Sequence, residues 1–472
     1  MMSFLASFAL LAVVFPQGTP AGQQGGTASP PAEKALLSAS ERASLRDKFV
    51  KYIDADENYV RATGLRDREK AGRTLEKAKE AFDTEWDKYG KKGNLLGAMA
   101  DLRAIFDNCF LHKRPSFSFG QLRRETVKEE GTEFSFFLPK SYNPDKPTRT
   151  IVVVPGTTAP GVTAWTKSSD YFAAVWEKSA ASGDSIFQVC SPPGELELDP
   201  VPDFSRESAE SEEDKRNRVI FTGLAHLMGN FNVDRPRVFL DFGRGSCGFG
   251  LRFLTMFPDR FAGVILREPV AVDDIRLGTL HGMSVLMLKT TATAKVVDAL
   301  EKQLTEVSPG TIKVIDATDE YPHKGSTEAI EAWMAEQKRN MTPTKIVIEP
   351  NHDRFNRAYW ASIDTATPLL TASPDAKPRL EVEANRNDNR IVVKAQGIES
   401  FVLFLNDDLV DLDKDFTVVV NDKAVVEKKI RTFRQLYDGM IVRRDWDYLF
   451  PVMYRSTVPK PAAQNGDKPE KQ

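Results

Sequence analysis

The sequence predicts an α/β protein: a mainly parallel sheet, with an N-terminal helical region and a small C-terminal β domain. Between residues 120 and 338, short apolar segments alternate with segments of helical periodicity. Several of the apolar segments are continuous runs, which is typical of strands buried on both faces. This alternation favours a parallel sheet with helices on both sides, and such sheets bind ligands at the C-terminal ends of their strands.

The central region is expected to run from residue 120 to residue 338. Its candidate strands are Glu133–Leu138, Thr150–Val154, Ile186–Val189, Val238–Phe242, Gly263–Leu266, Ser284–Leu288 and Ile312–Ile315. Its candidate helices are Asp170–Ala180, Asp214–Met228, Gly248–Phe257, Lys295–Val307 and Thr327–Lys338. The segment Ser191–Glu213 is rich in proline and acidic residues, and we interpret it as an insertion near the ligand-binding edge of the sheet.

Two further regions flank this core. Residues 35–110 carry apolar stripes at helical spacing, and such stripes are more often packing surfaces than cofactor sites. Residues 345–425 show short alternating segments, which predict a β-sandwich-like domain with a hairpin turn at Asn421-Asp422. Residues 426–455 are expected to form a C-terminal helix, and residues 456–472 a disordered tail.

The N-terminus predicts export. Phe4–Phe15 is an apolar run too short to span a bilayer, although no Lys or Arg precedes it. Residues 1–22 are therefore interpreted as a signal peptide and residues 23–34 as a linker, which predicts a secreted or periplasmic protein without a membrane span. The net charge of −3 gives no reason to expect nucleic-acid binding.

Cysteine and histidine patterns exclude two other classes. The three cysteines, Cys109, Cys190 and Cys247, cannot make a disulfide framework, so we expect reduced and buried thiols. The sequence contains no H-E-x-x-H or C-x-x-C pattern. Neither a metal site nor a cofactor is predicted.

The stretch Arg237–Gly250 is the most informative motif, because an apolar strand breaks into a glycine-rich turn before a helix. In a nucleophile elbow, such a turn projects a catalytic side chain above a sheet. Residues 128–338 resemble the α/β-hydrolase superfamily, near secreted depolymerase-like esterases and prolyl-oligopeptidase-like peptidases. The resemblance is carried by Phe136–Tyr142, Ile151–Gly156, Arg237–Leu240, Phe257–Phe261 and Ser284–Leu288.

That resemblance implies a nucleophile, an acid and a histidine in this order. Aligned without gaps, the nucleophile column falls on Arg244 and the acid column on Thr293. A guanidinium cannot attack a carbonyl and Thr carries no negative charge, so both columns are degenerate. His323 occupies the base column. A two-residue shift would instead use Ser246 as nucleophile, and Cys247 is a third option.

The remaining parts of such a site are also present in outline. The resemblance implies oxyanion donors at Gly156, Thr157 and Gly245. Acidic residues that could replace the missing acid are Asp298, Asp316 and Asp319.

Three functions stay open. The first is a degenerate hydrolase, in which Arg244 either binds an anionic ligand at a helix N-terminus or forms an internal ion pair with Glu268. The second is an active serine hydrolase that cleaves a small-molecule ester or a peptide with Ser246 and His323. The third is an interaction or scaffold protein of the cell envelope.

Overall fold

The computed structural model describes residues 35–127, 131–156, 167–190, 212–271, 275–369 and 371–459. The expected signal peptide and linker, Thr157, nearly all of the insertion at 191–213 and most of the tail lie outside the described residues. No helix in the described ranges is long and apolar enough to cross a membrane.

The central sheet has eight strands in the order β1-β2-β4-β3-β5-β6-β7-β8. The strands from β3 to β8 are parallel, and β2 runs antiparallel to both of its neighbours. Their bounds are β1 Leu122–Val127, β2 Thr132–Phe137, β3 Thr148–Val154, β4 Ile186–Cys190, β5 Val233–Phe242, β6 Gly263–Arg267, β7 Ser284–Lys289 and β8 Ile312–Asp316. The predicted fold class is confirmed, and β1 is an additional edge strand.

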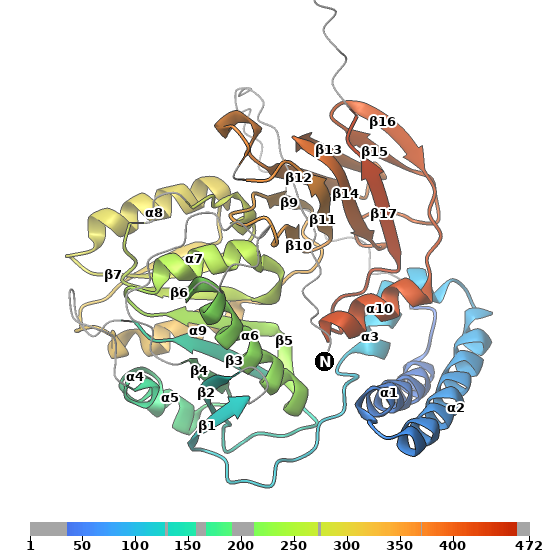
Figure 1. Ribbon diagram of the computed structural model, residues 1–472, viewed down its shortest axis with the longest axis horizontal. Helices are drawn as coiled ribbons and strands as arrows, with labels where there is room; N and C mark the ends of the chain where they lie inside the picture. The colour runs from blue at the N-terminus through green and yellow to red at the C-terminus, as the bar shows by residue number, and fades with distance from the viewer. Residues whose placement is uncertain are drawn as a thin grey trace, which may run out of the picture.

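Helices cover both faces of this sheet (Figure 1). Alternate side chains of each strand point to opposite faces, so Val152 and Val154 join one apolar cluster while Ile151 and Val153 join the other. The first face packs against α6 (Glu212–Asn230), α7 (Cys247–Met256) and α8 (Ala294–Val307). The second packs against α4 (Ser168–Val175), α5 (Glu177–Ser182) and α9 (Thr327–Glu336).

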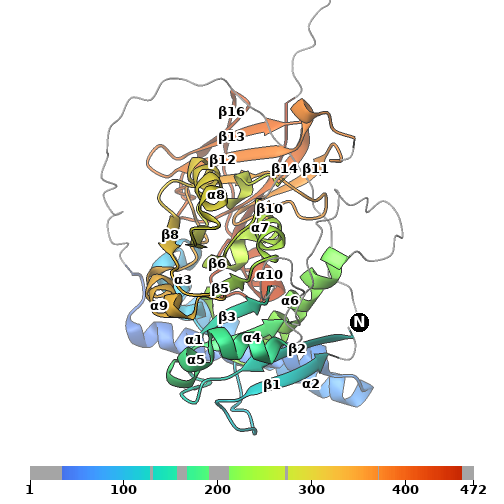
Figure 2. The same cartoon turned by 90° about the vertical axis from the view of Figure 1, so that its left-hand side faces the viewer.

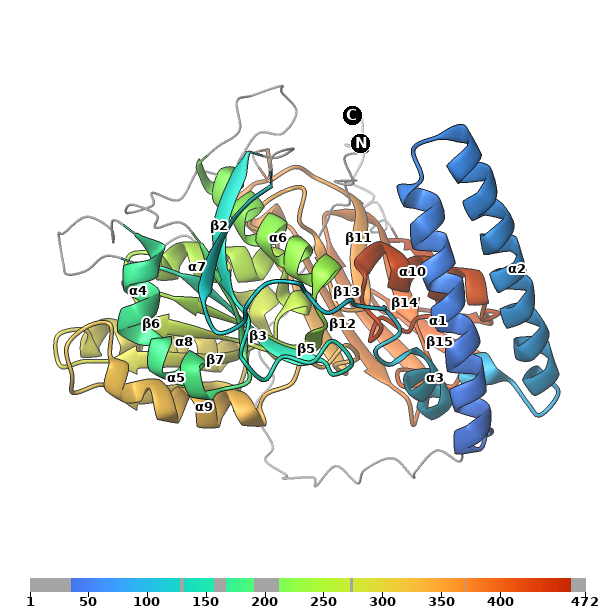
Figure 3. The same cartoon turned by 90° about the horizontal axis from the view of Figure 1, so that it is seen from below.

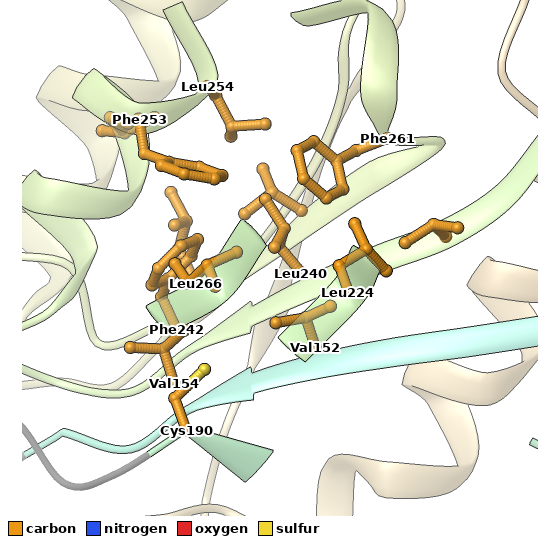
Figure 4. Close-up of a cluster of buried hydrophobic side chains, with 14 of the residues drawn as sticks. Val152, Val154, Cys190, Leu224, Leu240, Phe242, Phe253, Leu254, Phe261 and Leu266 are labelled. Carbon is orange, nitrogen blue, oxygen red and sulfur yellow. The ribbon is translucent and has the colours of Figure 1, made fainter. Parts of the chain in front are cut away.

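The α7 helix is fixed directly above the sheet. Figure 4 shows Phe253 and Leu254 of this helix facing Leu240 of β5 and Leu266 of β6. All four side chains are fully buried. Because α7 follows the turn after β5, this packing holds the turn in one position relative to the sheet.

The C-terminal domain is a sandwich of two sheets, which Figure 2 shows stacked at one end of the central sheet. One sheet has the order β10-β11-β14-β17 and the other the order β16-β15-β13-β12-β9. The first four strands are β9 Lys345–Ile348, β10 Arg357–Ala358, β11 Ala361–Ala366 and β12 Arg379–Asn385. The others are β13 Arg390–Gln396, β14 Ile398–Leu405, β15 Phe416–Val420, β16 Lys423–Glu427 and β17 Val452–Thr457. Asn421 and Asp422 both have positive φ, as the hairpin turn between β15 and β16 requires.

The C-terminal helix is shorter than the predicted span of 426–455. Helix α10 covers Phe433–Arg443 and ends at Arg444, which is in the left-handed region. Residues 452–457 instead form β17, because Val452 and Tyr454 alternate into the sandwich core and the strand pairs with β14. Ile430 lies before the helix and is 85% exposed.

The N-terminal helices pack against the C-terminal helix. Helices α1 (Ala39–Arg61), α2 (Leu65–Gly90) and α3 (Met99–Phe106) share one apolar cluster with α10, and Figure 3 shows α1 and α10 side by side. The rings of Tyr52 and Tyr437 stack with centroids 5.0 Å apart. Ser38 and Glu41 form a capping box at the start of α1. Helices α1 to α3 and α10, which are far apart in the sequence, therefore build a single structural unit.

Candidate functional site

The turn between β5 and α7 consists of Gly243, Arg244, Gly245 and Ser246. It lies against the end of β3, where Gly243 donates a backbone hydrogen bond to Val154 O at 3.0 Å. A Cβ atom added to Gly156 would lie 1.9 Å from the Arg244 carbonyl oxygen, so no larger residue fits there. Gly245 has φ +80°, a conformation that glycine adopts without strain. The glycines thus permit a sharp turn in close backbone contact with β3.

The side chain of Arg244 is held by two partners. Its guanidinium lies 4.7 Å from the centroid of the Tyr321 ring, and its Nη2 forms an ion pair with Glu268 Oε2. The Arg244 backbone N–H also donates to the Tyr321 hydroxyl at 3.0 Å. The Arg244 and Glu268 side chains are only 15% and 4% exposed, so the pair is weakly screened by solvent. Of the two sequence-based hypotheses for Arg244, the structure shows the internal ion pair.

Glu268 joins this arginine to the histidine. It directly follows β6 and has φ +52°, an uncommon conformation for a residue other than glycine. Its second oxygen, Oε1, lies 3.0 Å from His323 Nε2. The other imidazole nitrogen, Nδ1, lies 2.9 Å from the Asp319 carbonyl oxygen. The structure therefore places Arg244, Glu268 and His323 in a continuous chain of polar contacts.

The proton count of this chain is constrained by its geometry. A neutral imidazole has one N–H, and here both ring nitrogens face oxygen acceptors. Both contacts can be hydrogen bonds only if Glu268 and His323 together hold two protons, either as a protonated imidazole beside a carboxylate or as a neutral imidazole beside a protonated carboxyl group. Burial lowers the pKa of His323, and the hydrogen bond to the Asp319 carbonyl opposes that shift.

Ser246 does not contact the histidine in the structure. Its side chain is 2% exposed, and Oγ donates a hydrogen bond to Pro155 O at 3.1 Å. Among the described residues, the hydrogen bonds of the His323 ring go to Glu268 and Asp319, not to Ser246. Ser246 is the N-cap residue of α7, yet its hydroxyl caps no helical N–H. Cys247 is fully buried, and burial raises the pKa of its thiol.

Thr293 lies at the N-cap of α8, and its hydroxyl contacts Thr290. The acids proposed as replacements have other partners as well. Asp298 and Asp316 lie 3.2 and 3.6 Å from Lys289 Nζ. Asp319 is adjacent to His323, but its carboxylate oxygen is 3.8 Å from Nδ1 and its side chain is 37% exposed.

The expected oxyanion donors lie at the same turn, apart from Thr157, which is outside the described residues. Gly156 packs against the backbone of the turn, and a Cβ atom added to Gly243 would lie 2.4 Å from Gly156 N. Gly245 immediately follows Arg244 at the apex. Two of the three expected donor residues are thus near Arg244.

A second buried polar network lies next to the turn between β5 and α7. Asp241 of β5 accepts hydrogen bonds from Arg267 Nε at 2.8 Å and from Trp176 Nε1 at 2.7 Å. Arg267 also donates to Pro322 O at 2.8 Å, one residue before His323. Asp241 and Arg267 are fully buried, and the charge of each stabilises the other. This network ties β5, β6 and the histidine loop together.

Sequence reasoning named Glu268 as an ion-pair partner for Arg244 but missed its contact with His323, and it missed the Asp241–Arg267 pair. The position of Glu268 beside this turn could have been predicted from the sequence. Strands β5 and β6 are parallel neighbours, so the residues that follow them meet at one edge of the sheet. No group of three or more His, Cys, Asp or Glu side chains within the described part of the chain could hold a metal ion.

Comparisons with known proteins give similarity at the level of fold. No protein-family profile matches the chain, and no curated protein resembles it in sequence. Among solved structures, a thermostable esterase aligns over 46% of this chain and 63% of its own length, with 18% identity and a TM-score of 0.33. A putative dipeptidyl aminopeptidase IV from Bacteroides ovatus aligns over 47% of this chain and 36% of its own, with 12% identity and a TM-score of 0.34. A ferulic acid esterase from Anaeromyces mucronatus aligns over 48% and 93%, with 12% identity and a TM-score of 0.34.

The fold can be stated from the structure itself. A mostly parallel eight-stranded sheet has helices on both faces and a sharp strand-turn-helix at β5 and α7. This is an α/β-hydrolase-type fold, as the sequence resemblance implied. The central domain carries two additions, the N-terminal helices and the C-terminal sandwich.

Proposed function

We propose that this chain is an α/β-hydrolase-fold protein that acts by binding a partner rather than by covalent hydrolysis. One observation carries the proposal: the apex of the turn presents Arg244, whose charge is paired with Glu268. A guanidinium stays protonated and has no lone pair with which to attack a carbonyl. The same carboxylate engages His323 Nε2, so the imidazole is not directed at a hydroxyl group.

The position of Ser246 supports the same conclusion. A serine nucleophile needs a base within about 3.2 Å of its oxygen, and a path for the substrate carbonyl. Ser246 Oγ is buried and donates to a backbone carbonyl instead. An active serine hydrolase would therefore require both Ser246 and Glu268 to move.

The paired charge also bears on the anionic-ligand hypothesis. A carboxylate or phosphate at Arg244 would compete with Glu268, which already supplies an anion at contact distance. We therefore favour a scaffold or partner-binding role over the capture of a small anion at this turn.

A fluorophosphonate probe, which labels activated serines, tests the proposal. Wild-type protein and Ser246→Ala should both remain unlabelled, while an active serine esterase in the same reaction is labelled. Ser182→Ala serves as a matched control, since Ser182 lies on α5, which packs on the opposite face of the sheet from α7. Wild-type labelling that persists in Ser182→Ala and disappears in Ser246→Ala would show that the protein is an active hydrolase.

We further propose that the chain is exported and that residues 1–22 are removed. The apolar run Phe4–Phe15 and the small residues after it support this proposal. N-terminal sequencing of the protein from an extracytoplasmic fraction should begin near residue 23. Recovery of the intact N-terminus from the cytoplasm alone would refute it.

A further inference from the structure

Strand β16 (Lys423–Glu427) is an edge strand with an apolar surface. In the sheet order of the described residues, its one neighbour is β15. The side chains of Val425 and Val426 are 48% and 67% exposed, and Ile430 just beyond the strand is 85% exposed. Figure 1 shows β16 at the outer margin of the sandwich.

Such an edge offers backbone groups to another strand. Along its outer side, the N–H and C=O groups of an edge strand are available for a further ladder. Val425 and Val426 point to opposite faces of the sheet, because successive side chains alternate. An added strand would therefore cover an exposed valine on each face.

The sequence of this edge is complementary to itself. If two copies pair antiparallel with Val425 opposite Val425, then Lys423 of each copy lies opposite Glu427 of the other. Opposite charges directly across an antiparallel pair are favourable, and the Lys423–Glu427 pair occurs twice in a two-fold arrangement.

Other registers lose this complementarity. Moving the centre of pairing to Val426 sets Lys423 opposite Lys429, which places like charges together. Moving it to Ala424 removes the contact between Lys423 and Glu427. The register centred on Val425 is thus favoured over its two neighbours.

The present partners of these charges do not prevent the rearrangement. Glu427 Oε2 is 3.0 Å from Lys429 Nζ, and the two side chains are 24% and 36% exposed. Exposed ion pairs contribute little to stability and exchange readily.

We propose that the protein forms a two-fold homodimer by antiparallel pairing of β16 with β16 of a second copy. The two five-stranded sheets then become one continuous sheet across the dimer. Only five residues pair on each side, so the dimer is expected to dissociate in the micromolar range. This inference is independent of whether the hydrolase-like site is active.

Sedimentation equilibrium of the mature chain over micromolar concentrations tests the proposal through charge reversal. Lys423→Glu and Glu427→Lys each place like charges across the interface and should raise the dissociation constant by about tenfold. The double variant Lys423→Glu/Glu427→Lys restores both pairs and should return to within about threefold of the wild type. Lys302→Glu on α8 makes the same change in net charge as Lys423→Glu, away from the edge, and should have no effect.

A second variant separates loss of pairing from loss of folding. Val426→Lys puts a charge on the edge at a site that is 67% exposed, so it should keep the native circular dichroism spectrum and abolish the dimer. A wild-type protein that stays monomeric, or a dimer insensitive to both single reversals, would overturn the proposal. Dimerisation that appears only after truncation at residue 459 would identify the C-terminal tail as the occupant of this edge and would also overturn it.

Discussion

Replacing Glu268 by Gln should destabilise the protein by about 2–3 kcal/mol. Glu268 is 4% exposed and contacts Arg244 with one oxygen and His323 with the other. Glutamine keeps the volume but not the charge, and its amide presents one acceptor in place of two. One charge-assisted contact is therefore lost, and removal of such a contact costs about 1.5–3 kcal/mol. The cost is below that of breaking a fully buried pair, about 3–5 kcal/mol, because the Arg244 guanidinium remains partly exposed to solvent and in contact with the Tyr321 ring.

Urea unfolding followed by tryptophan fluorescence measures the effect. A double-mutant cycle with Arg244→Met isolates the ion pair, and we expect a coupling free energy of about 1 kcal/mol or more. The control is Asp298→Asn, because Asp298 pairs with Lys289 at 3.2 Å but is 59% exposed, so its loss should cost less than about 1 kcal/mol. A cost below about 0.5 kcal/mol for Glu268→Gln, or additive single effects, would refute the ion pair as a stabilising feature.

Three other outcomes are expected. Burial lowers the pKa of His352 to about 2, so on acidification the unfolded state takes up the proton before the folded state does. The free energy of unfolding should therefore be at its maximum above about pH 6.5 and lower by up to about 2 kcal/mol at pH 5. Urea titrations at both pH values should show this loss, reduced in His352→Gln, and an unchanged midpoint would contradict it. Burial also raises the pKa of Cys109 and Cys190 to about 12, and a thiol reagent should modify none of the three cysteines before unfolding and all three afterwards. Phe49 is fully buried, and its ring centroid lies 4.4 Å from that of Phe106. Phe49→Ala should lower the free energy of unfolding by about 3–5 kcal/mol in the same urea assay, and a near-neutral result would count against the apolar cluster of the N-terminal helices.

The sequence predicted the central sheet well because its strands are continuous apolar runs. Strands such as β5 and β6 are largely buried, and their central residues Val238–Leu240 and Val264–Leu266 are uninterrupted apolar runs. Strand β1 was not predicted because it lies at the sheet edge, where its residues Leu122–Val127 are half-buried or exposed and do not form an apolar run. Strand β17 was merged into the predicted helix because a short apolar segment next to a helix has no distinct period.

The candidate site was predictable in position but not in contacts. The resemblance indicated where Arg244 and His323 lie, since both follow strands that end at one edge of the sheet. It could not indicate that Glu268 bridges them, because that depends on backbone conformation and side-chain rotamers after β6. The orientation of Ser246 towards Pro155 O likewise depends on how closely the end of β3 approaches the turn.

The packing of α1 to α3 against α10 has a consequence for biogenesis. These helices are synthesised long before α10, yet their apolar cluster includes Leu436, Met440 and Leu449. Domains generally fold in order of synthesis, so the surface of α1 to α3 stays uncovered until the central sheet and most sandwich strands have been synthesised. A nascent chain that stalls or is cleaved before α10 would expose that surface to chaperones and proteases.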